Sequence, residues 1–312
     1  MIAILLKRMG QAVFVAWAVG TVSFILLRMM SSDMAFRIAA GRYGYDNVDS
    51  AAALAVSDEL GLERPAWQQY LEWLVNLLRL DLGDSLVSGL PVTREIGHLL
   101  EYTLMLSGVA IVIAAVLALP VGIYAAVWAG GWFDRISVFA SAMLRAQPVF
   151  VIGLILLLIF ALQLRLFPVA GFDGPDHVVL PAIALALSLV SVSSRVIRHS
   201  AFEVIHSEYF RFSRIKGLDY RQTFVRHGLR NFAVPVVAFM GIQLVSLIEG
   251  VVMIESLFSW PGIGHGLAHA IFSRDIPMIQ GAALAMGLLF VALNLLVDLA
   301  CFWIDPRERA GE

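Results

Sequence analysis

The chain has 312 residues, of which 60% are hydrophobic and only 15% are charged; a soluble globular domain carries about 25% charged residues. This composition excludes a soluble enzyme, a disordered chain and a disulfide scaffold, and it favours a polytopic membrane protein. The 22 basic and 24 acidic residues give a net charge of −2, which offers no general attraction for nucleic acid. The single cysteine, Cys301, excludes an internal disulfide and a Cys-x-x-Cys site.

The two lysines, Lys7 and Lys216, also limit the possible chemistry. An ATP-binding P-loop requires a Gly-Lys pair followed by Ser or Thr, but Lys7 precedes Arg8 and Lys216 precedes Gly217. We therefore expect no cofactor on this chain. If ATP drives its activity, a partner subunit must bind the ATP and its Mg²⁺.

Six stretches are long and apolar enough to cross a bilayer, which requires about 20 residues per helix. They are residues 9–27, 102–128, 136–164, 178–194, 232–254 and 276–304. The first is too long for the apolar part of a signal peptide, so we expect an uncleaved anchor. Backbone amides in lipid must find partners within their own segment. The sequence therefore predicts an all-α polytopic membrane protein with six transmembrane helices.

Basic residues indicate the orientation of these spans. Lys7 and Arg8 precede the first span, two arginines follow the sixth, and eight basic residues lie between the fourth and fifth. The opposite loops, 165–177 and 255–275, hold one arginine each. Both termini are therefore predicted to lie in the cytoplasm.

The segment 31–98 is then external, and its 5 arginines and 10 acidic residues indicate a solvated surface. Asp49 or Ser50 can cap a short helix that Gly61 ends. Pro65 suits the first turn of a second helix, which carries an apolar stripe expected to pack on the membrane surface or on the bundle. The stripe consists of Trp67, Tyr70, Leu71, Leu74 and Leu78.

Four segments follow from these spans. They are an N-terminal anchor helix (1–30), an external helical segment (31–98), a five-helix core with a cytoplasmic connection at 195–231 (99–304), and a cytoplasmic tail (305–312).

The connection at 195–231 combines charged and aromatic residues at helical spacing. A solvated basic loop would explain the charges but not the aromatic residues, nor the glycine at 217 between two helical stretches. A helix–glycine–helix element of this kind is typical of a surface that docks into a partner's groove.

Several motifs resemble those of permease subunits in binding-protein-dependent ABC importers, and the similarity is greatest to the dipeptide, oligopeptide and nickel permeases. The most specific are residues 208–218, the His-Gly-Leu-Arg-Asn run at 227–231, and the Trp-Pro-Gly segment at 260–262. In place of the Glu-Ala-Ala form of the cytoplasmic loop, Arg211-Phe212-Ser213 is present, while Gly217 is kept. The resemblance covers nearly the whole chain.

The resemblance implies a type I ABC importer transmembrane-domain fold in a bacterial inner membrane. The chain would form half of a pore with a second homologous permease, above two ABC ATPase subunits. A periplasmic or lipid-anchored binding protein would deliver the cargo. Short peptides are the leading cargo, and nickel or a nickel chelate is the alternative. The residues implied to couple the pore to the ATPase are Glu208, Tyr209, Phe210, Arg211, Arg214, Lys216, Gly217 and Leu218.

Charged residues within the spans have two interpretations, since an intramembrane charge costs on the order of 3 kcal/mol and must face protein or water. Arg145, Gln147 and Glu249 are candidates for a translocation path, or the two charges form structural pairs. Asn294 and Asp298, one turn apart, are interpreted as a helix-packing pair. A membrane-embedded enzyme that uses Arg145, Glu249 and Asp298 is the alternative from another functional class.

Two histidines, His265 and His269, are four residues apart and share one helix face if the segment is helical. Such a pair binds a metal when a third ligand is available. The alternative is a polar end to a short external helix. We predict no complete metal site. His265 and His269 are the candidates for an incomplete one.

Overall fold

The computed structural model describes all residues except 1, 30–33, 44–48, 61–64, 80 and 305–312. Helices make up the fold, and within the described ranges no β-strand forms, which confirms the all-α class. The cytoplasmic tail at 305–312 lies outside the described residues. The main helices are α1 (Ile2–Met29), α2 (Met34–Tyr43), α3 (Ser50–Leu60), α4 (Ala66–Leu78), α5 (Val92–Val127), α6 (Trp132–Arg145), α7 (Val149–Leu156), α8 (Val179–Ile205), α9 (Glu208–Ile215), α10 (Tyr220–Thr223), α11 (Leu229–Leu257), α12 (Ile263–Ser273) and α13 (Ile276–Ile304).

Four helices among the described residues, α1, α5, α8 and α13, are long and apolar enough to cross a membrane. A fifth span results if α6 and α7, with the π-helical turn η3 (Leu157–Gln163), count as one broken span. The 29-residue α11 also has sufficient length, about 44 Å at 1.5 Å per residue. The total of six spans remains a prediction.

The third predicted span is not one continuous helix. The chain bends by 100° between α6 and α7, because Pro148 has no amide hydrogen to donate and keeps the preceding Gln147 out of helical geometry. Arg145 therefore does not lie inside a continuous third span, as the apolar stretch at 136–164 predicted. Arg145 instead ends α6 at the break and is exposed.

The contacts divide the chain into two compact units. The first contains residues 1–8, 104–260 and 290–312, and the second contains residues 9–103 and 261–289. Each unit combines stretches that are distant in sequence. The four segments predicted from the hydropathy pattern remain a prediction about topology.

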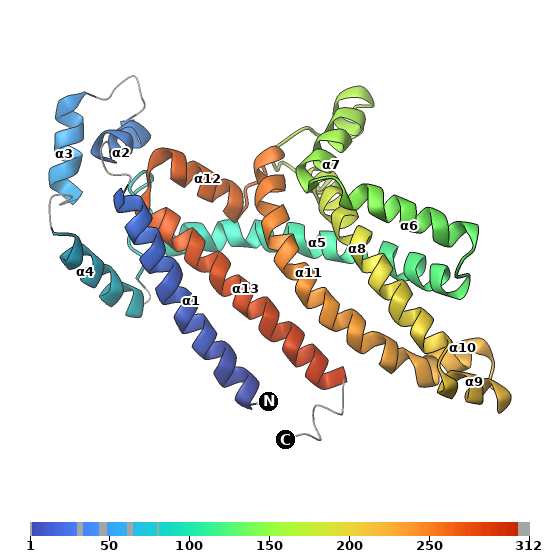
Figure 1. Ribbon diagram of the computed structural model, residues 1–312. Helices are drawn as coiled ribbons and strands as arrows, with labels where there is room; N and C mark the ends of the chain where they lie inside the picture. The colour runs from blue at the N-terminus through green and yellow to red at the C-terminus, as the bar shows by residue number, and fades with distance from the viewer. Residues whose placement is uncertain (1, 30–33, 44–48, 61–64, 80, 305–312) are drawn as a thin grey trace. The chain divides into compact units, whose positions relative to one another are not determined.

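In the first unit, α8 packs against α6, α7 and α11 (Figure 1). It continues to Ile205, so Arg195 and Arg198 lie on this helix rather than in the predicted connection. α5 approaches α8 closely at Gly122, where a Cβ atom would lie 2.5 Å from Ile197 Cγ2 and 2.7 Å from the Ser194 carbonyl oxygen. A glycine at this position is required by the helix packing.

The ends of α1 and α13 meet in the same unit. Arg8 Nε and Nη2 both lie 2.7 Å from Asp298 Oδ2. Asn294 instead donates to the Phe290 carbonyl oxygen within α13. The partner of Asp298 is therefore a basic residue on α1, so Asp298 joins two helices, in agreement with its interpretation as a helix-packing residue.

The Trp-Pro-Gly segment forms a buried anchor in the first unit. Trp260 is fully buried, and its ring meets Phe172 edge-on at 4.9 Å. Its backbone amide donates to the Glu255 carbonyl oxygen, and the Gly171 amide donates to the carbonyl oxygen of Phe258. The motif therefore joins the loop at 165–177 to the end of α11.

In the second unit, α4 packs on α1 through its aromatic residues. The Tyr70 hydroxyl lies 2.9 Å from Thr21 Oγ1, and the ring of Trp73 occupies the space that a Cβ atom on Gly20 would need. Trp67 and Leu78 of the predicted stripe are exposed. The contact with α1 is therefore made by part of the stripe, together with Trp73, which was absent from the prediction.

Asp49 and Pro65 both lie at the start of a short helix, as the sequence predicts. Asp49 Oδ1 accepts a hydrogen bond of 2.8 Å from the Ala52 amide, so Asp49 caps α3. Pro65 directly precedes the first residue of α4. Gly61 lies outside the described residues.

A buried carboxylate directly precedes α13. Asp275, 3% exposed, accepts hydrogen bonds from Ser85 Oγ at 2.5 Å and from the backbone amides of Leu86 and Met278. A carboxylate at a helix N-terminus satisfies amides that have no partner within the helix. Asp275 thereby fixes the segment around Ser85 to the start of α13.

Candidate coupling element and membrane cavities

The segment that joins α8 to α11 forms a helix–turn–helix, the coupling element, comprising residues 208–228 (Figure 1). Ser207 precedes α9, and Asp219 caps α10 by accepting a 2.6 Å hydrogen bond from the Gln222 amide. α10 continues through a π-helical turn, η5 (Phe224–Gly228), directly into α11. The helical stretch predicted after Gly217 therefore continues into α11 with no loop between them.

Gly217 makes the sharp turn between α9 and α10. Its φ angle is +90°, and the space where a Cβ atom would lie is empty within 4 Å. The glycine is therefore required by the backbone conformation, which L-residues rarely adopt, and not by close packing.

Phe210 anchors the element to the bundle. It is 3% exposed and belongs to a hydrophobic cluster with Ile197, Val204 and Phe232. Its ring meets Tyr220 edge-on at 5.2 Å. Burial raises the pKa of the Tyr220 phenol, with a smaller opposing effect from Arg214.

The other face of α9 is exposed and apolar. Tyr209, Phe212 and Ile215 are 39%, 57% and 75% exposed, and their spacing of three residues places them on one side of the helix. The ammonium group of Lys216 lies 4.6 Å from the centre of the Phe212 ring. Phe212 and Ile215 were absent from the predicted coupling residues, although this spacing could have revealed them.

The remaining predicted coupling residues lie at the end and on the surface of the element. Arg214 Nη1 donates to the Leu218 carbonyl oxygen at 2.9 Å and closes the turn around Gly217. Glu208 and Arg211 are exposed. All eight predicted residues therefore lie within one element, with Phe210 on its inner face.

An ion pair connects α8, which leads into this element, to α6. Arg198 donates to both carboxylate oxygens of Asp134, at 2.5 and 2.6 Å. Asp134 is 4% exposed, and it also accepts a 2.8 Å hydrogen bond from the Gly130 amide. Sequence reasoning did not find this pair, because the partners are 64 residues apart.

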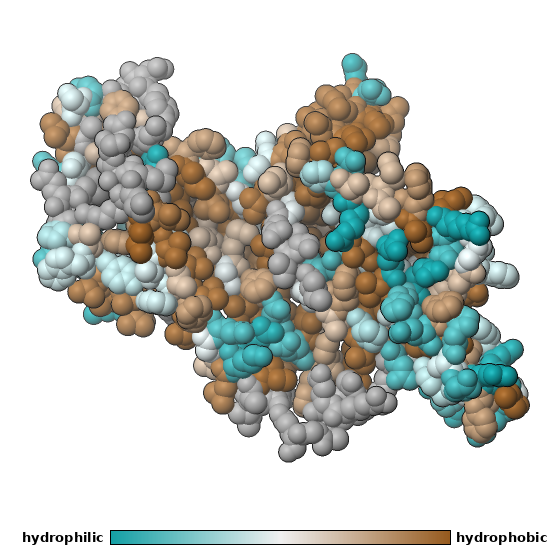
Figure 2. Space-filling model, in the orientation of Figure 1, coloured by the Kyte–Doolittle hydropathy of each residue, from teal (hydrophilic) through white to brown (hydrophobic). Residues whose placement is uncertain are grey.

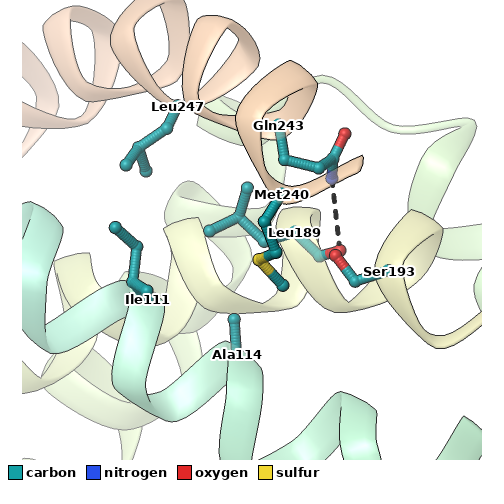
Figure 3. Close-up of a pocket in the computed structure, with 7 residues that line it drawn as sticks. All are labelled: Ile111, Ala114, Leu189, Ser193, Met240, Gln243 and Leu247. Atoms are coloured by element: carbon teal, nitrogen blue, oxygen red, sulfur yellow. Dashed lines mark hydrogen bonds between the residues drawn. The ribbon is translucent and has the colours of Figure 1, made fainter. Parts of the chain in front are cut away.

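Two cavities lie along α8 and α11 in the first unit. The first, of about 210 Å³, is bounded by α5, α8 and α11 and has an apolar wall (Figure 3). The second, of about 270 Å³, lies between α7, α8 and α11. Leu189 and Leu247 line both cavities. The cavities are therefore neighbours on either side of this leucine pair.

Polar groups beside the first cavity are only partly satisfied. Gln243 Nε2 lies 3.5 Å from the Leu189 carbonyl oxygen, which is long for a hydrogen bond. The Ser193 hydroxyl is buried and has no hydrogen-bond partner among the described residues. Such a group is uncommon and unfavourable in an interior.

Two of the three predicted path residues can be placed relative to these cavities. Arg145 and Gln147 are exposed at the break after α6, next to Pro148, which lines the second cavity. Glu249 lies on α11 before Gly250, which lines the same cavity, but its side chain lies outside the described residues.

His265 and His269 face each other on α12. Their Nε2 atoms are 3.1 Å apart, and their ring centres are 4.6 Å apart. Burial lowers the pKa of His265, and the neighbouring His269 lowers it further. Among the described residues no group of three or more His, Cys, Asp or Glu is placed to hold a metal.

Comparison with known proteins identifies the family. Residues 118–310 match the model of the binding-protein-dependent transport system inner membrane component, and residues 1–86 match the model of the N-terminal part of such components. The chain belongs to this family. It is a permease of a binding-protein-dependent ABC importer of the dipeptide and oligopeptide type, with the type I transmembrane fold.

The relatives extend over the full length of the chain. It is 36% identical over 286 residues to a glutathione transport system permease protein, GsiC, of Pectobacterium atrosepticum, covering 92% of each protein. It is 33% identical over 309 residues to the proteins of the same name from Escherichia coli and Salmonella choleraesuis, covering 99% of each. The permease is thus a multi-pass inner-membrane transport subunit.

Proposed function

We propose that this permease forms half of the pore of an ATP-driven importer for short peptides. The second half would be a homologous permease, and two ATPase subunits would bind below. An external binding protein would deliver the cargo. In this arrangement both termini lie in the cytoplasm, on the same side as the coupling element.

The observation that carries the proposal is the coupling element itself. Phe210 holds α9 to the bundle from within, while Tyr209, Phe212 and Ile215 leave an apolar face exposed. An amphipathic helix that presents such a face is suited to a groove in a partner protein. Closure of the ATPase pair would then move α9 as a rigid body and shift the bundle between its two open states.

The cargo assignment rests on the family branch and on the relatives. The relatives are named for the transport of glutathione, which is itself a tripeptide. We therefore place short peptides, glutathione among them, before nickel complexes. Arg145, Gln147 and Glu249 remain our candidates for the path.

The coupling assignment is tested by changing the exposed face of α9. The Phe212→Glu variant should insert into the membrane normally but lose most ATPase co-purification and peptide uptake, because a charge in an apolar interface is costly. Phe212→Leu, which keeps the face apolar, should retain both. Normal uptake by Phe212→Glu would refute the docking role of this face.

The cargo is tested separately with the cognate binding protein. We expect binding of dipeptides, tripeptides or glutathione in calorimetric titrations. Binding of nickel complexes alone would overturn the peptide assignment and leave the coupling element unaffected.

A further inference from the structure

A pair of histidines on α12 has the geometry of a metal chelate. His265 and His269 are one helical turn apart, which places both imidazoles on the same side of α12. Their Nε2 atoms, the nitrogens most distant from the backbone, approach to 3.1 Å. His265 is half-buried and His269 is exposed, so the pair is open to solvent.

The separation of the two nitrogens fits a shared metal ion. Bonds of about 2.1 Å from each imidazole to one metal would span this separation if they met at about 95°. That angle lies close to the 90° of square-planar or octahedral coordination, and a shorter bond moves it towards the tetrahedral value. Both ligands therefore reach one ion with no change of helix geometry.

The contact between the two rings also suits metal binding. Imidazole binds a metal through an unprotonated nitrogen. When no metal is bound, one Nε2–H can donate to the other Nε2, and a metal ion would replace this shared proton.

We propose that His265 and His269 form a two-ligand binding site for a late first-row divalent metal ion, such as Cu²⁺, Ni²⁺ or Zn²⁺. Imidazole is a preferred ligand of these metals, with Cu²⁺ the strongest. The described residues supply no third ligand, so water or a small external ligand fills the other positions. The site is independent of the cargo and of the coupling element.

Copper titration of the full-length permease in detergent tests this proposal. We expect the wild type to bind one more Cu²⁺ than the His265→Ala/His269→Ala double variant, with an electron paramagnetic resonance signal that shows two nitrogen ligands. Each single variant should weaken that binding by about tenfold or more, because loss of even an outer-shell partner costs 10–100-fold. His227→Ala, which removes an exposed histidine from η5, should bind as the wild type does.

Two results would overturn the proposal. One is equal copper binding by the wild type and the double variant, and the other is a signal with a single nitrogen ligand. Both histidines are at least partly exposed, so monodisperse elution of the variants establishes that they are folded. Failure of peptide uptake would leave this result unchanged, because the titration does not depend on transport.

Discussion

The ion pair between Asp134 and Arg198 predicts an asymmetric response to mutation. Arg198→Ala leaves a carboxylate that is 4% exposed and still accepts a hydrogen bond from the Gly130 amide. Removing one partner of a buried pair costs about 3–5 kcal/mol. Asp134→Ala instead leaves Arg198, whose side chain is 30% exposed and can reach water. The loss is then closer to the 1.5–3 kcal/mol of a charged hydrogen bond.

The free energy of unfolding in mixed detergent micelles measures this difference. Arg195→Ala is the matched control, since Arg195 is an exposed arginine on the same helix and should cost less than about 1 kcal/mol. The Asp134→Ala/Arg198→Ala double variant should show a coupling energy between the two residues well above 0.5 kcal/mol. The reasoning is refuted if Arg198→Ala costs no more than Arg195→Ala, or if Asp134→Ala costs more than Arg198→Ala.

Three further substitutions test the packing and the turn. Gly217→Val should abolish uptake but not insertion, since a left-handed conformation costs a non-glycine residue about 1–2 kcal/mol and β-branched residues more; Gly217→Asn should keep most uptake, and equal uptake by both would contradict this. Gly122→Ala should destabilise the permease by about 1–3 kcal/mol through overpacking, whereas Gly108→Ala, which meets nothing within 4 Å, should not destabilise it; thermal unfolding distinguishes them. Ser193→Ala should be neutral or stabilising, because it removes a buried hydroxyl that has no partner in the described part of the chain. Ser191→Ala should lose about 0.5–1.5 kcal/mol with its hydrogen bond to the Ser188 carbonyl oxygen. Greater loss of stability from Ser193→Ala than from Ser191→Ala would contradict this reasoning.

Hydropathy and motif spacing predicted the helical class, a long helix at five of the six apolar stretches and the glycine turn at 217. The end of α8 was not predicted, because this helix continues to Ile205, beyond the apolar stretch at 178–194. The bend before Pro148 was visible as a Gln-Pro pair, but a continuous apolar stretch on both sides concealed it. Aromatic spacing alone did not distinguish the buried Phe210 from the exposed Phe212, because the direction of a helix face depends on what packs beneath it. Contacts such as Asp134–Arg198 require tertiary structure, since neither residue has its partner nearby in sequence.

The position of Arg198 gives this ion pair a consequence beyond stability. Arg198 lies on the last part of α8, which leads directly into the coupling element. Its partner Asp134 lies in the first turn of α6, and α6 ends at the break beside the second cavity. Packed helices move as rigid bodies, so a displacement of α9 that carries α8 should also carry α6 through this pair. Loss of the pair should therefore reduce uptake per ATP hydrolysed more than Gly122→Ala does at equal loss of stability.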